Sequence, residues 1–274
     1  MLSYQHSYHA GCFADVLKHV TLSLLLQYMK KKDAAFFYLD THAGRGVYDL
    51  NHPHALKTGE SSKGISLLWE QRAHLPEIFT PYLQSIEQMN HKDATSARHY
   101  PGSPALAISL LREIDRATFC ELHPYEHTIL SHIPRNARKV FSSHSDGLEQ
   151  LSAALPPREK RGLIFIDPSY EIKQDYKTVP QKIKQAVNRF AAGTFCVWYP
   201  IFNDHQPHMQ LLRGLNAIGA SKTLNISQKL KKTPAHGMIG SGLWIINPPF
   251  VLKSQLEIAL KTLNRIYDTT SQID

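Results

Sequence analysis

Short apolar runs alternate with amphipathic stretches along most of the chain. The apolar runs, rich in aromatic and branched residues, predict buried strands over 36–40, 118–122, 139–142, 162–167, 194–199, 223–230 and 243–247. Apolar residues at helical spacing predict helices over 14–31, 103–112, 124–132, 147–155, 179–192, 208–218 and 252–267. Strands that alternate with helices pair in parallel, so we expect an α/β fold built on a mostly parallel, doubly wound sheet.

Two stretches depart from this alternation. Residues 48–98 are polar and show helical patterns at 65–71 and 77–89 but no clear strand. We interpret them as a small helical insertion, which leaves residues 1–47 and 99–274 as the core domain. Near the C-terminus, the last two predicted strands are joined by a loop without a helical pattern. We therefore expect them to form an antiparallel C-terminal hairpin.

The composition narrows the class of protein. Apolar residues make up 42% and charged residues 20%, which excludes disordered, collagen-like and coiled-coil chains. No apolar stretch reaches the roughly 18 residues of a membrane helix, and the N-terminus has no secretory pattern. The 3 cysteines are widely spaced, so we expect a protein of the reducing cytoplasm with no membrane partner. A net charge of +8 favours nucleic acid as the partner.

Chemistry is expected where the parallel strands end, because ligands of such sheets bind beyond the carboxyl ends of the strands. The first candidate is the turn Asp40-Thr-His-Ala-Gly-Arg-Gly46, where glycines let backbone amides approach a ligand. It lacks the third glycine of a dinucleotide fingerprint and the Gly-Lys-Ser/Thr of a phosphate loop. A tight turn without a ligand is an equally open interpretation.

The second candidate is Asp167-Pro-Ser-Tyr170, directly after a predicted strand. An aspartate at the end of a buried strand needs a polar partner or solvent. Pro168 restricts Asp167 to extended geometry, so the acceptors of this turn should point outward. Together with the flat ring of Tyr170 they suit a planar heterocycle that carries an exocyclic amine. The alternative is an ordinary Asp-Pro turn with a surface tyrosine.

A second motif of the same form, Asn247-Pro-Pro-Phe250, follows the last predicted strand. Only one of the two motifs can lie at the centre of the sheet. Asp167 ends the fourth predicted strand and more strands follow it. We therefore expect Asp167 to be the functional copy and Asn247 to form a structural turn, or else to line the substrate groove.

Three further features carry candidate chemistry. Glu121 ends a strand and could accept both hydroxyls of a ribose or cap the helix that follows, while Asp146 could cap a helix or accept from an adenine amine. The 16 histidines show no metal-ligand spacing, so we expect no metal. The basic, glycine-containing loop at 229–242 could hold nucleic-acid phosphates.

The combination of Asp-x-x-Ala-Gly-x-Gly, a strand-end acid and Asp-Pro-x-Tyr resembles the class I S-adenosylmethionine-dependent methyltransferases. The last motif is typical of those that act on adenine N6 or cytosine N4. The chain further resembles the bacterial 23S rRNA adenine-N6 methyltransferase J family, formerly labelled as external-DNA catabolism proteins. The matching segments are Ser3–Gly11, Ala14–His19, Leu39–Gly44, Pro101–Pro104, Glu121–Pro124, Asp146–Gly147, Gly162–Pro168, Trp198–Pro200 and Ile246–Pro249.

This resemblance implies a Rossmann-like methyltransferase fold with a helical insertion, S-adenosylmethionine as cofactor and 23S rRNA as partner. Separately, we expect the protein to be a monomer. The expected cofactor-binding residues, with Gly44 added from the glycine turn, are His19, His42, Gly44, Ser103, Glu121, Asp146, Gly147 and Asp167. The expected catalytic residues are Asp167, Pro168 and Tyr170, and the expected substrate contacts are Tyr4 and Tyr170. The adenine would stack on Tyr170 while its amine donates to Asp167 and to the Pro168 carbonyl during in-line methyl transfer.

One residue departs from the family pattern. Ser169 stands where the family has a second proline, so the loop loses one φ constraint. We expect the loop to be looser and the protein to keep its activity. Two alternatives stay open. A DNA adenine methyltransferase would share every catalytic residue, and a DNA-binding protein linked to uptake of external DNA would explain the charge.

Overall fold

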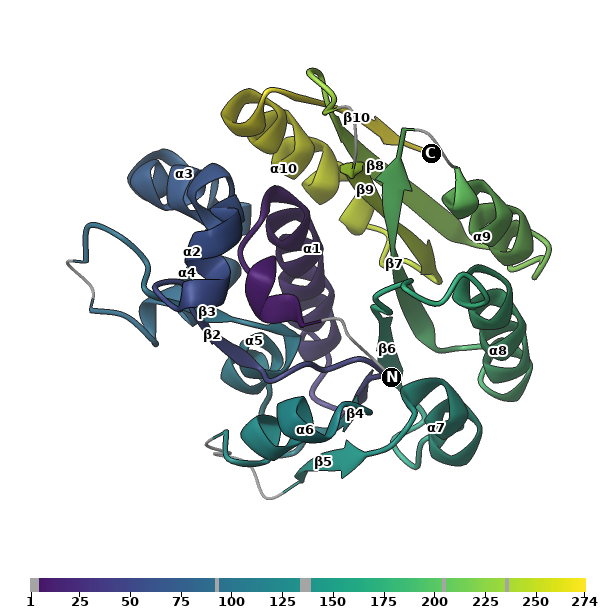
Figure 1. The fold of residues 1–274 in the computed structure, drawn as a ribbon. Helices are drawn as coiled ribbons and strands as arrows, with labels where there is room; N and C mark the ends of the chain where they lie inside the picture. The colour runs from purple at the N-terminus through teal and green to yellow at the C-terminus, as the bar shows by residue number, and fades with distance from the viewer. Residues whose placement is uncertain (1–4, 92–93, 134–138, 204–205, 235–236) are drawn as a thin grey trace.

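The computed structural model describes residues 5–91, 94–133, 139–203, 206–234 and 237–274 (Figure 1). An eight-stranded sheet runs through the molecule in the order β10-β8-β9-β7-β6-β1-β4-β5. Its strands are β1 (Phe37–Asp40), β4 (Arg116–Glu121), β5 (Val140–His144), β6 (Gly162–Ile166), β7 (Thr194–Phe202), β8 (Thr223–Leu230), β9 (Met238–Ile246) and β10 (Thr269–Ile273). The predicted α/β fold is confirmed, because β1, β4, β5, β6 and β7 pair in parallel.

The C-terminal part of the sheet is antiparallel. The predicted hairpin is confirmed as β8 and β9, and β9 also pairs antiparallel with β7, so it lies between β7 and β8. β10 is an additional edge strand, antiparallel to β8, that the sequence pattern does not predict. Its sequence Thr-Thr-Ser-Gln-Ile is mostly polar and exposed, so its backbone pairing with β8, and not a buried apolar face, defines it as a strand.

Helices cover both faces of the sheet. The helices of the core are α1 (Phe13–Lys30), α5 (Ser103–Leu110), α6 (Pro124–Ser131), α7 (Gly147–Ala154), α8 (Asp175–Arg189), α9 (Pro207–Asn216) and α10 (Leu252–Tyr267). α1, α5 and α10 pack in one apolar cluster on one face, while α7, α8 and α9 pack in a second cluster on the other. Among the described residues, no helix is long and apolar enough to cross a membrane.

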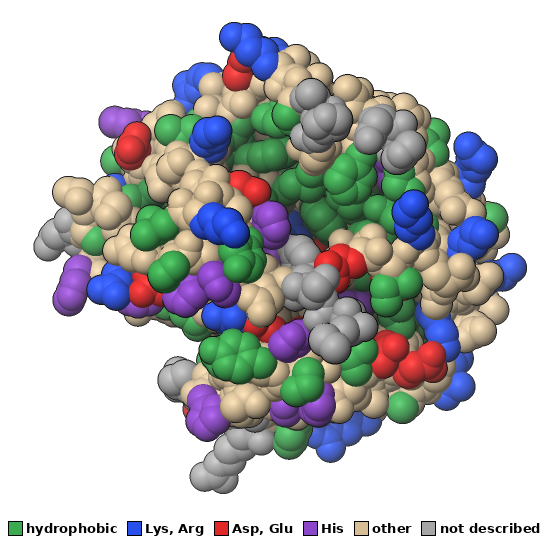
Figure 2. Space-filling model, in the orientation of Figure 1, with side chains coloured by type: hydrophobic (Ala, Val, Ile, Leu, Met, Phe, Trp, Pro, Cys, Tyr) green, Lys and Arg blue, Asp and Glu red, His purple; other side chains and the backbone are tan. Residues whose placement is uncertain are grey.

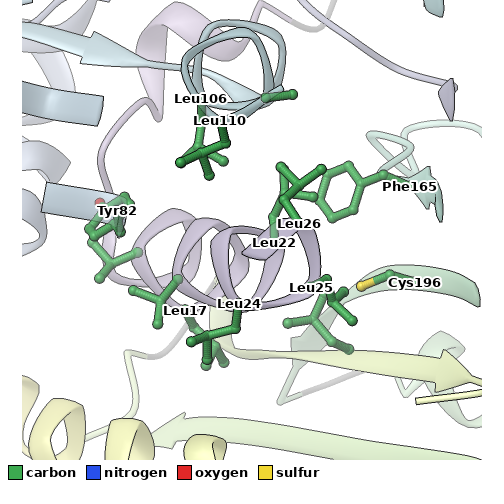
Figure 3. Close-up of a cluster of buried hydrophobic side chains, with 14 of the residues drawn as sticks. Leu17, Leu22, Leu24, Leu25, Leu26, Tyr82, Leu106, Leu110, Phe165 and Cys196 are labelled. Atoms are coloured by element: carbon green, nitrogen blue, oxygen red, sulfur yellow. The ribbon is translucent and has the colours of Figure 1, made fainter. Parts of the chain in front are cut away.

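α1 is the central helix of the first face and is apolar on nearly all sides. It packs against α5 and α10 as well as against the sheet. Figure 3 shows Leu22 and Leu26 directed toward Phe165 of β6, and Leu25 toward Cys196 of β7. Because neighbours surround this helix, any charged residue on it must find a polar partner inside the protein. This constraint applies to two charged residues in its first turns, Asp15 and Lys18.

The insertion is closed by a short two-stranded sheet of β2 (Val47–Asp49) and β3 (His99–Pro101). The helices of the insertion are α2 (Pro53–Thr58), η2 (Glu60–Lys63), α3 (Ile65–Glu70), η3 (Arg72–His74), η4 (Glu77–Phe79) and α4 (Thr80–Glu87). The short helix η1 (His6–Tyr8) precedes α1 in the N-terminal segment. Two expectations were wrong in detail. β2 extends into the segment expected to contain no strand, and the helix expected over 77–89 is divided because Pro81 lies in the first turn of a new helix.

The insertion shares its apolar core with the rest of the protein. Ile65, Trp69, Phe79 and Tyr82 are fully buried and belong to the same cluster as α1. The hydroxyl of Tyr82 also lies 3.1 Å from that of Tyr100 in β3. The boundary between a core domain and an insertion at residues 48–98 stays a prediction, since the packing joins the two continuously.

Candidate active site

A cavity of about 520 Å³ opens at the carboxyl ends of the parallel strands, where ligands of this fold class bind. Figure 2 shows this face hollowed near its centre and bordered by histidine and apolar side chains. Each expected cofactor residue lies on the cavity: His19, His42, Gly44, Ser103, Glu121, Asp146, Gly147 and Asp167. Residues far apart in the sequence therefore meet at one edge of the sheet. Tyr4 lies outside the described residues.

Glu121 is held by two backbone amides at the end of β4. The amide of Gly44 donates to Oε2 and the amide of His123 donates to Oε1, both at 2.7 Å. Burial raises the pKa of Glu121 above its ordinary value, and these two hydrogen bonds oppose the rise. The cap of the following helix comes instead from the His123 side chain, which accepts from the Glu126 amide. A fixed carboxylate whose oxygens retain further lone pairs suits a diol such as a ribose.

Asp146 caps the helix that follows it, which is one of the two roles that the sequence left open, while its contact with an adenine amine stays a prediction. Its Oδ1 accepts from the amide of Leu148 at 2.8 Å and from that of Glu149 at 3.4 Å, so it caps α7. The same side chain lines the cavity. Gly147 fixes the approach of the helix to the sheet, because a Cβ there would collide with the backbone of Thr41. The N-terminus of α7 is thus pressed against the loop that follows β1.

Two histidines on the cavity are neutral in this structure. Burial lowers the pKa of His19 to about 3 and that of His42 to about 4. The Nδ1 of His19 lies 2.8 Å from the hydroxyl of Tyr100, and that of His42 lies 2.8 Å from Oγ1 of Thr41. Neutral rings can each donate and accept a hydrogen bond without adding charge. Among the described residues, no cluster of three His, Cys, Asp or Glu side chains could hold a metal ion.

Asp40 lies behind the cavity, at the end of β1, and sequence reasoning gave it no role as a separate residue. It is fully buried, accepts from the Tyr38 hydroxyl at 3.1 Å and is hydrogen-bonded to Ser103. Burial raises the pKa of Asp40 to about 7, and the nearby charge of Asp167 adds to the rise. A buried acid whose carboxyl titrates near neutrality makes the stability of the fold dependent on pH.

We expect Asp40→Asn to remove part of this pH dependence. Between the ordinary pKa of 3.8 and the folded value of about 7, the folded state holds the Asp40 proton more tightly than the unfolded state. Asp40 therefore lowers the stability as the pH rises through this range, by at most about 4 kcal/mol. Urea unfolding of both proteins at pH 5.5 and 8.5 measures this effect. The free energy of unfolding of the variant, relative to that of the wild type, should be higher at pH 8.5 than at pH 5.5. An equal difference at both pH values would contradict the assignment.

Asp167 stands at the end of the central strand β6 and is paired with a buried lysine that the sequence analysis did not select. Nζ of Lys18 donates to Oδ2 of Asp167 at 2.6 Å and lies 2.8 Å from Oδ1 of Asp15. The Lys18 side chain is only 4% exposed. Burial alone would lower the pKa of Lys18, but the two carboxylates raise it well above its ordinary value. A permanent cation therefore fixes the carboxylate of Asp167 within the cavity.

Asp15 connects this pair to the N-terminal segment. Its Oδ2 accepts from the backbone amide of Gly11 at 2.9 Å and lies 2.8 Å from Nε2 of His6. Burial would raise the pKa of Asp15, but His6 and Lys18 lower it well below its ordinary value. The signal that could have identified Asp15 and Lys18 is their position, since they are the two charged residues in the first two turns of a helix that is rich in apolar residues.

Tyr170 lies away from the cavity, contrary to the expectation that its ring is offered at the sheet edge. Its backbone has a φ of 55°, in the left-handed region, and its side chain is 6% exposed. The ring stacks on Tyr176 of α8 with centroids 4.6 Å apart, and its hydroxyl donates to the Trp198 carbonyl. Asp167 and Pro168 do line the cavity, together with Ser169. A role for Tyr170 in substrate binding stays a prediction.

The structure places Asn247 in a structural turn, as we expected. Because β9 runs antiparallel to β7, its last residue pairs with the beginning of β7, at the opposite edge of the sheet. The Asn247 side-chain amide donates to the carbonyls of Ala191 and Gly193, both at 2.8 Å. These bonds tie the end of β9 to the loop before β7. Of the two Asp/Asn-Pro motifs, only the one at Asp167 therefore lies on the cavity.

The sequence of this chain is similar to that of a known protein family. Residues 33–271 match the family model described as Ribosomal RNA large subunit methyltransferase D, RlmJ. The chain is 42% identical over 266 residues to Ribosomal RNA large subunit methyltransferase J of Haemophilus influenzae, covering 97% of this chain and 94% of the relative. It is also 42% identical over 265 residues to the protein of that name from Escherichia coli, covering 96% and 93%.

A solved structure agrees with this similarity. The crystal structure of a protein from Legionella pneumophila str. Philadelphia 1 superimposes with a TM-score of 0.92 at 45% sequence identity. The match covers 97% of this chain and 98% of that protein. The fold, including the antiparallel C-terminal strands and the helical insertion, is therefore similar over nearly the full length of both chains.

Proposed function

The chain belongs to the RlmJ family of ribosomal RNA large subunit methyltransferases, and from this premise we propose that it methylates the N6 amine of an adenine in 23S rRNA with S-adenosylmethionine as donor. The observation that carries the proposal is the position of Asp167. It ends the central strand, lines the same cavity as the expected cofactor residues, and is held there by a buried lysine.

The residues of the cavity fit the proposed cofactor. Glu121 is a carboxylate fixed by two amides, which suits the ribose hydroxyls, and Asp146 at the start of α7 suits the adenine amine. Ser103 and the neutral His19 and His42 add polar groups near Asp167. When bound, S-adenosylmethionine supplies an activated methyl group on a sulfonium. The net negative charge of these acids favours a cationic sulfonium over its neutral product.

Asp167 and Pro168 are assigned to the target amine. Lys18 occupies Oδ2 of Asp167, so we assign Oδ1 as the acceptor for one N–H of the adenine amine and the Pro168 carbonyl as the acceptor for the other. Two acceptors in fixed positions withdraw the nitrogen lone pair from conjugation with the ring and direct it toward the methyl group. Such pre-organised polar groups act without having to reorganise during the reaction.

Lys18 holds the carboxylate of Asp167 in place. A hydrogen bond from a charged donor to one carboxylate oxygen fixes the orientation of the other oxygen. The contact at 2.6 Å does this for Asp167, and Asp15 balances the charge of Lys18 on its other side. The three side chains therefore form a buried network in which each charge has an opposite neighbour.

The experiment is transfer of tritiated methyl from S-adenosylmethionine to protein-free 23S rRNA, with duplex DNA in parallel. We expect label in the RNA that elutes as N6-methyladenosine after digestion to nucleosides. Label in another nucleoside would overturn the assignment of the amine. Label only in DNA would favour the DNA methyltransferase, and binding of nucleic acid without any transfer would favour a DNA-binding protein.

A further inference from the structure

An apolar wall adjoins Asp167 inside the cavity. It consists of Trp198, Pro200 and Phe202 of β7 together with Met238 of β9. Side chains alternate between the two sides of β7. Val197, Tyr199 and Ile201 pack in the cluster of α8 and α9, while Trp198, Pro200 and Phe202 line the cavity on the other side; Trp198 also contacts that cluster. Trp198, Phe202 and Met238 are half-buried, so each retains surface that can contact a ligand.

A β-bulge completes this wall. Ile201 pairs with Gly240 but Phe202 pairs with Met238, so β9 has one extra residue at this point, Ile239. Ile239 joins the cluster of α8 and α9 on the far face. Without the bulge, Ile239 would lie opposite Phe202; with it, Met238 does. Bulges redirect side chains and are frequent beside active sites.

Trp198 connects the wall to the acceptor. Nζ of Lys18, which is bonded to Asp167, lies 5.2 Å from the centroid of the Trp198 ring. The backbone carbonyl of Trp198 accepts from the Tyr170 hydroxyl at 2.8 Å. The same residue therefore holds Tyr170 in its buried position and places its own ring near the carboxylate. Because the ring of Tyr170 stacks on Tyr176, Trp198 and not Tyr170 lines this part of the cavity.

We propose that Trp198, Phe202 and Met238 hold the target base, packing on its ring while the amine reaches Asp167. This inference rests on the proposed function. A purine has two apolar faces and a polar edge, which matches an apolar wall next to a fixed carboxylate. The thioether of Met238 can adapt to the ring, because methionine is flexible and polarizable. Base recognition is thereby assigned to β7 and β9, and Tyr170 becomes a support for the wall.

The first test compares steady-state methylation of protein-free large-subunit rRNA by the full-length wild type, Trp198→Ala and Trp198→Phe. Loss of a stacking ring should lower kcat/KM about five- to hundredfold in Trp198→Ala. Trp198→Phe should retain most of the activity, because it keeps an aromatic face. The Kd for S-adenosylhomocysteine should stay within about twofold of wild type in both variants, because no expected cofactor residue is changed.

The second test uses tryptophan fluorescence. The chain has 3 tryptophans, and only Trp198 is among the residues that line the cavity, while Trp69 and Trp244 are buried in the apolar clusters. Adenosine added to protein that carries S-adenosylhomocysteine should quench the wild type and the control Trp244→Phe, but not Trp198→Phe. An unchanged kcat/KM in Trp198→Ala, or a quench that survives in Trp198→Phe, overturns the proposal. A wild type without any RNA methylation would instead refute the proposed function.

Discussion

Replacing Asp167 with alanine is expected to lower kcat for methyl transfer by about a hundred- to a thousandfold or more, with much of the cofactor affinity retained. The variant removes the acceptor that we assign to the target amine and leaves Lys18 beside an empty position. Most of the expected cofactor contacts lie elsewhere in the cavity, at Glu121, Asp146 and the two neutral histidines. Single-turnover transfer of labelled methyl, together with calorimetric titration of S-adenosylhomocysteine, measures the two effects separately.

The second Asp/Asn-Pro motif provides a matched control for this prediction. Asn247→Gly keeps the left-handed backbone that Asn247 adopts, with a φ of 53°, while it removes the amide that bonds to Ala191 and Gly193. We expect a modest loss of stability and a normal kcat, because this turn lies at the opposite edge of the sheet. Normal turnover in Asp167→Ala combined with loss of activity in Asn247→Gly would show that the wrong motif had been assigned.

Replacing Lys18 with methionine is expected to have the largest effect on stability. The side chain is 4% exposed and separates two carboxylates, so its removal leaves the buried Asp15 and the partly buried Asp167 without their common cation. Breaking a buried ion pair in this way typically costs about 3–5 kcal/mol. Urea unfolding monitored by circular dichroism measures the loss. The same variant should also lower kcat, since the Asp167 carboxylate would lose the hydrogen bond that holds it in place.

Two further variants separate the charge network from general packing. Lys182→Met breaks the partly exposed contact to Glu149 on the surface, and we expect a loss of no more than about 1 kcal/mol. In the double variant Asp15→Asn with Lys18→Met, one of the two buried charges is neutralised. It should therefore recover part of the stability that Lys18→Met loses. Wild-type stability and turnover in Lys18→Met would disprove the role of the network.

The order of the main strands and helices of the core was determined by the sequence, while β10 and the short strands that close the insertion were not predicted. Apolar periodicity predicts secondary structure because a buried strand and an amphipathic helix each require a fixed spacing of apolar side chains. The strands that end in Asp40, Glu121 and Asp167 are found in this way, and a parallel sheet then brings their ends to one edge. Strand count alone selected Asp167 over Asn247, and the structure adds that β9 runs antiparallel to β7, which places Asn247 at the opposite edge of the sheet.

Only the tertiary structure decided which side chains meet at that edge. Lys18 and Asp167 are 149 residues apart, so no local pattern relates them. The burial of Tyr170 depends on its left-handed backbone and on its stacking with Tyr176. The direction of the Met238 side chain depends on a bulge between β7 and β9. Local spacing encodes the elements because it acts through one helix or strand at a time. The partners of a buried charge and the direction of a loop side chain depend on contacts between elements, which exist only once the chain has folded.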